Sequence, residues 1–259
     1  MGWIGRAKLL QMCWVMSPVA TAELGTDGWI KGLMKQVLEG RNINPAYALV
    51  FAATIMLVLR VFAGGILKLF SPPGLLCISG VFSAIGLYWL SGAAGTAVFV
   101  AFVLYALGQT YYWPCVLGFV SERYPQGGAL TLNTVSAIGL LSAGSVGTPI
   151  LGAALDKSIH ASVSEHAPAL AEAASEDGSF MWMKHKKIDP DLRAAFTEQL
   201  SPDEAEHVNA VFTASKAEAG RDVLMYAVRF PVILLLAFGA IAFWFRSRGG
   251  YKPIVLQRE

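Results

Sequence analysis

The sequence predicts an all-α integral membrane protein with six transmembrane helices and an extramembrane helical insert between the last two. Of its 259 residues, 55% are hydrophobic and 15% are charged, and the mean hydropathy is +0.52, which is wrong for a soluble domain of this length. The apolar residues gather in runs near the roughly 20 residues that one helical crossing needs. Two such runs within Tyr105–Asp156 are joined by a short charged turn containing Pro125 and Gly127, as is typical of solute transporters.

The first predicted span is the weakest. Leu9–Ala22 is short and reaches membrane length only if it continues through Glu23 and Asp27 to Ile30. The basic residues before it and the small residues at its end also fit a cleavable signal peptide, so the run alone leaves both interpretations open. The other five spans are unambiguous apolar runs, at residues 46–70, 74–91, 96–120, 129–155 and 223–245.

The Lys and Arg residues of the short connections give the orientation, because these stay preferentially in the cytoplasm. With six spans, four positions fall on one side, namely those of Arg6 and Lys8, of Lys68, of Arg123, and of Arg246, Arg248 and Lys252, while the connection Glu23–Pro45 falls on the other. Both termini are therefore predicted to be cytoplasmic. The predicted organisation is residues 1–156 for transmembrane helices 1–5, 157–222 for an extracytoplasmic insert, 223–245 for helix 6 and 246–259 for a cytoplasmic tail.

The insert carries twelve Asp/Glu against seven Lys/Arg, a net charge of −5. Ser201 followed by Pro202 and Glu204 predicts the capped start of a helix, and Asp189-Pro190 predicts the start of another. The Ala/Ser/Glu-rich stretch 160–179 is expected to be loosely ordered.

Small residues recur four apart in the run 129–155, which predicts close helix packing. They form two stripes: Gly139, Ala143 and Gly147 on one, and Gly144, Thr148 and Gly152 on the other. In the preceding span, Gly108 and Pro114 predict a helix that bends easily.

Cysteine and histidine spacings predict no metal site and no cofactor. Each cysteine lies in a separate apolar run and is interpreted as a small buried side chain: Cys13, Cys77 and Cys115. The histidines all lie in the insert, without a helical spacing that suits a metal, and are interpreted as surface residues: His160, His166, His185 and His207.

Several segments together resemble the C-terminal half of a bacterial major facilitator superfamily (MFS) transporter. They are Glu23-Leu24-Gly25-Thr26-Asp27-Gly28-Trp29-Ile30, Leu59-Arg60-Val61-Phe62-Ala63-Gly64, Phe70-Ser71-Pro72-Pro73, Gly118-Phe119-Val120-Ser121-Glu122-Arg123-Tyr124-Pro125 and Gly144-Ser145-Val146-Gly147-Thr148-Pro149. The resemblance covers nearly the whole chain apart from the insert. It implies a six-helix half of the major facilitator fold in the bacterial inner (plasma) membrane, whose first run is a genuine span. It also implies a partner, either a separate N-terminal six-helix half or a second copy of the chain.

In that family the first and fourth spans of each half line the solute cavity, which makes their polar residues candidates for substrate binding. Tyr105, Gln109 and Tyr112 fall on one stripe of a helix, with Trp113 and Pro114 just beyond. An amide and two phenols suit a hydroxylated solute; aromatic packing is the equally weighted alternative. Asn133 is a further candidate, for solute contact or for a hydrogen bond between helices.

Charged residues within the spans are candidates for coupling and gating. Glu23 is a candidate proton-coupling group, or else lies in headgroup water beside Asp27. Arg60 is expected to reach the cytoplasmic surface or to pair with a neighbouring helix rather than to bind solute. The resemblance implies a gating element at Gly64, but Lys68 occupies its usual acidic position, which puts the family's ion-pair latch in doubt.

These features predict transport of a small polar solute, with a sugar-like solute as the candidate, by alternating access, with this chain as half of a secondary transporter of the symport type. The alternative is a truncated, non-transporting membrane protein, or an anchor that presents the acidic insert to a partner. No catalytic constellation lies within the spans, so no enzymatic activity is predicted, and no nucleic-acid binding.

Overall fold

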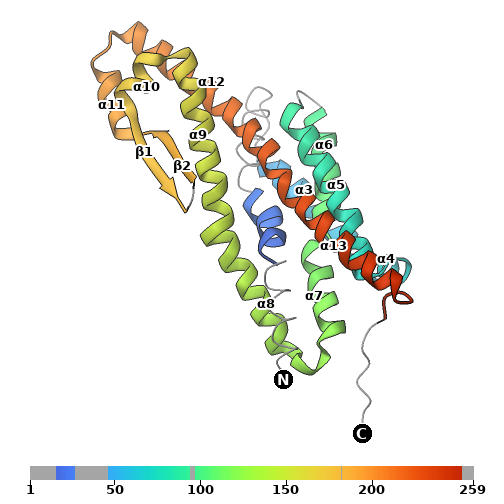
Figure 1. The fold of residues 1–259 in the computed structure, drawn as a ribbon. Coiled ribbons are helices and arrows are strands. Elements are labelled where there is room, and N and C mark those ends of the chain that lie inside the picture. Colours follow the sequence, from blue (N-terminus) through green and yellow to red (C-terminus); the bar gives the residue numbers. More distant parts are fainter. Residues whose placement is uncertain (1–15, 27–45, 94–96, 182, 253–259) are drawn as a thin grey trace.

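The computed structural model describes residues 16–26, 46–93, 97–181 and 183–252. They are mostly helical, as Figure 1 shows. The membrane part comprises η1 (Thr21–Gly25), α3 (Ala46–Val61), α4 (Ala63–Leu69), α5 (Pro72–Gly92), α6 (Ala97–Gln109), α7 (Tyr112–Arg123), η2 (Pro125–Gly127), α8 (Gly128–Ser142), η3 (Ala143–Gly147), α9 (Thr148–His166), α12 (Pro202–Ala227) and α13 (Arg229–Ser247).

Within the described residues, four helical stretches are long and apolar enough to cross a membrane, so the chain is a membrane protein by length and composition. They are Pro72–Gly92, Ala97–Arg123, Pro125–His166 and Pro202–Ser247. The last two are longer than one crossing and carry their helices onward into the insert.

Two of the predicted spans are not single helices. The run 46–70 breaks at Phe62 into α3 and α4, and the run 96–120 breaks between Gln109 and Tyr112 into α6 and α7. The predicted first span lies largely outside the described residues, which include only 16–26 of it. The six-helix arrangement of an MFS half therefore stays a prediction.

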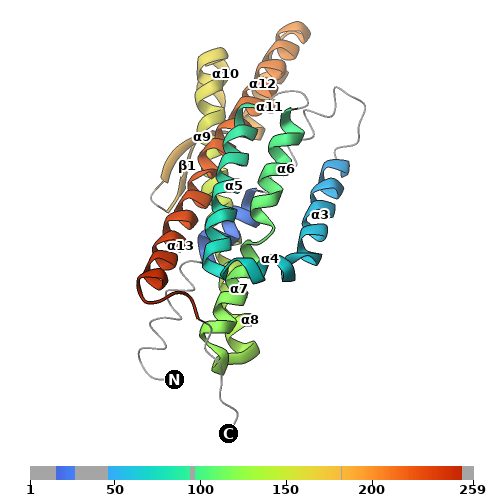
Figure 2. The same cartoon turned by 90° about the vertical axis from the view of Figure 1, so that its right-hand side faces the viewer.

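Helix α5 lies at the centre of the membrane part and packs against α6, α7, α12 and α13 (Figure 2). Two glycines allow the α5–α6 backbones to approach closely. A Cβ atom at Gly86 would come within 2.5 Å of the Tyr105 backbone nitrogen, and one at Gly108 within 2.3 Å of the Ser83 nitrogen. Since any side chain there would force the helices apart, these glycines fix the position of α6 and of Tyr105 on it.

The first small-residue stripe is confirmed as a packing surface. A Cβ atom at Gly139 would lie 2.8 Å from Met16 Cγ, and one at Gly147 would lie 2.2 Å from Thr21 Oγ1, so this stripe receives the helix of residues 16–26. The second stripe is different. A Cβ atom at Gly144 or Gly152 would meet no described atom within 4 Å, so that stripe faces outward.

The insert is more ordered than predicted. Its elements are the end of α9, α10 (Pro168–Ala174), β1 (Ser175–Phe180), β2 (Met183–Ile188), α11 (Pro190–Glu198) and the first half of α12. The two strands form an antiparallel hairpin beside α9 (Figure 1). The insert has its own apolar core, which includes Ile159, Val163 and Leu170. The expectation of loose order over 160–179 was wrong, because this core and the hairpin's backbone pairing hold the segment.

Both predicted helix starts in the insert are confirmed. The Asp189 carboxylate accepts hydrogen bonds from the backbone N–H groups of Asp191 and Leu192 at the start of α11. Ser201 and Glu204 form a complete capping box at the start of α12, where the hydrogen bonds also lower the pKa of Glu204.

Candidate functional site

The candidate site is built around a break in the fourth predicted span. Pro114 has no backbone N–H, so the carbonyl of Thr110, four residues earlier, loses its normal helical partner. Helix α6 ends at Gln109 and α7 begins at Tyr112, as the predicted bend requires. Arg60 supplies the missing donor, because its Nε donates to the Thr110 carbonyl oxygen at 3.3 Å.

The same guanidinium joins α3 to the helix of residues 16–26. Arg60 Nη2 donates to Glu23 Oε1 at 3.2 Å, forming an ion pair between two segments distant in sequence. The Glu23 side chain is 8% exposed, whereas that of Arg60 is 42% exposed. The arginine therefore pairs with a neighbouring helix, which is one of the two structural roles expected for it.

Glu23 lies in a π-helical turn, η1, which packs against a second π-helical turn, η3. Thr21 on η1 faces Gly147 on η3 at the close contact described above. Single π-turns are rare and recur at functional sites, because the extra residue per turn redirects a side chain. Here the irregular turn holds the charged residue of its helix.

A cavity of about 220 Å³ opens at the ion pair. Its lining residues come from α3, α7, α8 and the 16–26 helix: Glu23, Leu24, Arg60, Trp113, Pro114 and Leu140. A carboxylate and a guanidinium supply hydrogen-bond acceptors and donors, while an indole ring offers a flat apolar surface. This combination suits a small polar solute, which would hydrogen-bond to the charged pair and stack on Trp113.

The predicted stripe of Tyr105, Gln109 and Tyr112 is buried behind this cavity. The Tyr105 hydroxyl donates to the Ala22 carbonyl oxygen at 2.9 Å and also contacts the Thr26 hydroxyl, so it ties α6 to the 16–26 helix. The Gln109 amide donates to Met56 Sδ at 3.7 Å. The Tyr112 hydroxyl is buried near Ser83 without a hydrogen bond of ordinary geometry in the described structure. These contacts favour the packing alternative for the stripe.

The remaining predicted site residues lie elsewhere. Asn133 is exposed on α8, outside the residues that line the cavity. Gly64 and Lys68 belong to α4, where the structure describes the backbone but not the Lys68 side chain. The structure thus brings together Glu23, Arg60, Trp113 and Pro114 from the predicted set, and Asn133 lies apart from them.

The ion pair itself was not predicted, although its signal was present. Glu23 and Arg60 are residues of opposite charge within apolar runs, and a charge in hydrocarbon costs about 2.5–3.5 kcal/mol on insertion scales unless it finds a partner. The sequence also indicated that the Thr110 carbonyl needs a hydrogen-bond donor from elsewhere, since Thr110 lies four residues before Pro114, which has no N–H.

Across the part of the chain that the structure describes, no three His, Cys, Asp or Glu side chains gather as metal ligands would. The chain matches no protein-family model, no curated protein and no solved structure with which it was compared.

Proposed function

We propose that this chain transports a small polar solute across a membrane by alternating access, as one half of a secondary transporter of the MFS type. The observation that carries the proposal is the Glu23–Arg60 ion pair, which lines a cavity where helices are broken. Discontinuous helices and buried ionisable residues near the middle of the bilayer are how secondary transporters build solute and ion sites.

In this proposal Glu23 is the proton-coupling residue. Protonation removes the charge that holds Arg60 Nη2, so the guanidinium is released toward the cavity while its Nε stays on the Thr110 carbonyl. Among the described residues, the charged or titratable groups near Glu23 include Arg60 and the phenol of Tyr112. Because the bond between Arg60 and Glu23 joins α3 to the 16–26 helix, its loss loosens the contact between these two segments while α3 stays attached to the α6–α7 break.

The solute is proposed to be small and hydroxylated, of the size and chemistry of a sugar. Arg60 donates to its hydroxyl groups, Glu23 accepts from them, and Trp113 covers one face of its ring. Tyr105, Gln109 and Tyr112 support the cavity from behind by fixing α6 and α7 against their neighbours.

The partner in this proposal is a second six-helix half, provided by another copy of the chain or by a separate chain. The outward-facing stripe of Gly144, Thr148 and Gly152 gives it a surface for close helix packing. Leu140, which lines the cavity, lies on the same helical stretch, Pro125–His166, so in this proposal the cavity lies between the two halves.

The test is uptake by proteoliposomes that hold the chain alone or two copies linked in tandem. Radiolabelled hexoses, pentoses and polyols are supplied under an inward proton gradient. We expect gradient-driven uptake of at least one of them, and Glu23→Gln should lose this uptake while keeping solute exchange at equilibrium. Glu165→Gln removes the same charge from the exposed insert and should behave as the parent. Undiminished gradient-driven uptake by Glu23→Gln would refute the coupling role.

The alternative function, an anchor that presents the insert to a partner, is favoured by one observation: the insert has its own core and hairpin. The same vesicles discriminate the two functions. An anchor gives no uptake of any solute in the panel, with or without the gradient.

A further inference from the structure

The β1–β2 hairpin runs from the insert back toward the membrane part. Its base lies near the second half of α9, because Ile188 packs against the cluster that contains Ile159 and Val163. Nearer the tip, His185 Nε2 lies 3.6 Å from Asp156 Oδ2, and Asp156 is one to two helical turns nearer the start of α9 than those two residues. The strands therefore descend along α9 toward its apolar end, as Figure 1 shows.

Asp156 marks the edge of the apolar zone. It directly follows the apolar run 129–155, and its neighbour Ser158 hydrogen-bonds to Asp222, which directly precedes the apolar run of the last span. Just below these residues, Leu155 and Val223 pack in one cluster with Ala93, at the end of α5. Two helices, α9 and α12, thus change from polar to apolar at the level of Asp156, and α5 ends near it.

The hairpin continues past this level. Met181 is three residues beyond Gly178, the strand partner of His185, so at 3.3 Å per residue it lies up to about 10 Å further toward the membrane part. The tip residues are apolar: Phe180, Met181 and Met183. Met181 is 62% exposed and has a φ of +53°, so the turn holds an apolar side chain outward at the depth of the apolar helices.

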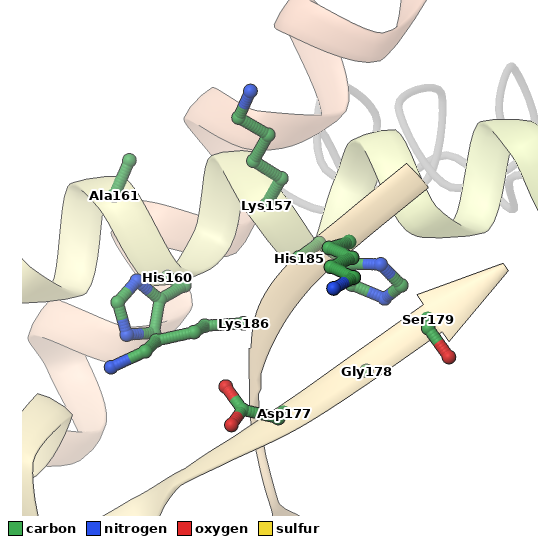
Figure 3. Close-up of a pocket in the computed structure, with 9 residues that line it drawn as sticks. Lys157, His160, Ala161, Asp177, Gly178, Ser179, His185 and Lys186 are labelled. Atoms are coloured by element: carbon green, nitrogen blue, oxygen red, sulfur yellow. The ribbon is translucent and has the colours of Figure 1, made fainter. Parts of the chain in front are cut away.

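Behind the tip, the hairpin and α9 line an open cavity of about 660 Å³ (Figure 3). Its lining residues are mostly basic: Lys157, His160, Lys184, His185 and Lys186, with Asp177 as the one carboxylate. Within the described structure, none of the three lysines forms an ion pair. Burial and the nearby Lys186 lower the pKa of His160, which is consistent with an excess of positive charge.

The cavity is shaped by a glycine. Gly178 on β1 is paired with His185 on β2, and a Cβ atom at Gly178 would come within 2.7 Å of the His185 ring. The imidazole therefore lies over the glycine while its Nε2 faces Asp156. Figure 3 shows His160, Asp177 and Lys186 reaching the other side of the cavity from three different elements.

We propose that this hairpin binds an anionic phospholipid of the leaflet on the insert's side of the membrane. The lipid phosphate lies in the cavity among Lys157, Lys184 and Lys186, and the tip residues Phe180, Met181 and Met183 lie among its acyl chains. An apolar tip beside lysines, at the depth of a membrane surface, is complementary to an anionic headgroup above hydrocarbon. The proposal depends on the chain being a membrane protein and is independent of its transporting a solute.

The depth of the tip is tested by attaching a fluorophore at Met181→Cys, in the full chain with Cys13, Cys77 and Cys115 replaced by serine. Leu192→Cys, exposed on α11 in the same insert, is the matched control. In nanodiscs, brominated acyl chains should quench the label at position 181 and leave that at 192 bright. A label at 181 that is quenched by aqueous iodide as strongly as that at 192, and not by brominated lipid, would overturn the proposal.

The phosphate site is tested by titrating short-chain phosphatidylglycerol into the detergent-solubilised chain and following its thermal unfolding. A lysine near an anionic surface contributes about 1 kcal/mol, or roughly fivefold in affinity, so Lys184→Gln with Lys186→Gln should weaken binding about 25-fold. Lys187→Gln with Lys216→Gln removes the same charge outside the cavity and should bind as the parent does. Equal binding by both double variants overturns the site. Inorganic phosphate or glycerol 3-phosphate that binds as tightly as the lipid overturns the lipid as its occupant.

Discussion

Glu23 and Arg60 form an ion pair in which the carboxylate is buried and the guanidinium is partly exposed. The distance between Glu23 Oε1 and Arg60 Nη2 is 3.2 Å, and the side chains are 8% and 42% exposed, respectively. The carboxylate depends on its partner, because its burial removes most of the solvent that would otherwise stabilise its charge. Arg60 keeps some access to the cavity and a second hydrogen bond to Thr110.

This asymmetry predicts the outcome of a double-mutant cycle. Arg60→Gln should destabilise the fold by about 1–3 kcal/mol, below the value for a fully buried pair because Arg60 is partly exposed. Glu23→Gln should cost less, because Arg60 retains the Thr110 carbonyl. The double variant should be more stable than the sum of the single losses predicts, and unfolding in detergent measures all three. Additive losses would show that the pair contributes no coupling energy.

Pro114→Ala should close the break between α6 and α7. The new N–H at residue 114 can donate to the Thr110 carbonyl in place of Arg60, so it supplies the hydrogen bond that a proline cannot make. We expect a rise in thermal stability, slow hydrogen exchange of the new amide and loss of the proposed uptake. A fast-exchanging amide at position 114 would show that the break persists without the proline.

Gly147 and Gly144 form a matched pair on one helical turn. Gly147→Ala would place a Cβ atom 2.2 Å from Thr21 Oγ1 and should destabilise the chain by about 1–3 kcal/mol through overpacking. Gly144→Ala meets no described atom and should be neutral or stabilising by up to about 1 kcal/mol. Thermal unfolding of the two variants in the same detergent gives the comparison. Equal effects would contradict the packing of the 16–26 helix on Gly147.

His160 makes the insert sensitive to acid. Burial and Lys186 lower its pKa in the folded state, so folding favours the neutral imidazole. Its contribution to stability is complete above the ordinary pKa of 6.5 and is lost as the pH falls from there toward the folded-state pKa. Hydrogen exchange of the α9–β1 segment should therefore quicken between pH 7.5 and pH 5. Much of that increase should be absent in His160→Gln, and an identical increase in the variant would exclude His160 as its source.

Local signals in the sequence predicted several elements of the fold. Ser201 and Asp189 start helices where capping chemistry places them, and the Gly139–Gly147 stripe packs as its spacing indicates. The hairpin was missed because Ser175–Phe180 and Met183–Ile188 lack the alternation of a half-buried strand. Contacts with α9 hold these strands in place, and β2 is distant from α9 in sequence. A short window of local sequence does not contain such contacts, so it cannot predict the strands.

The candidate site was likewise predictable in its residues but not in their contacts. Glu23, Arg60, Trp113 and Pro114 were chosen one by one from their chemistry, and the structure places them around one cavity. Their pairing depends on how α3 and the 16–26 helix approach α6 and α7. Tyr105, Gln109 and Tyr112 share a helix face as predicted, but which neighbour covers that face is decided by the close contacts at Gly86 and Gly108.

The helical stretch Pro202–Ser247 joins the insert to the membrane part, with α12 and α13 meeting at Val228. At 1.5 Å per residue its 46 residues extend about 69 Å. Its α12 part packs against α9, and its α13 part packs against α5. One continuous element therefore makes contacts in both the insert and the membrane part, so a variant that disturbs its packing in one of them acts on the element that also packs in the other.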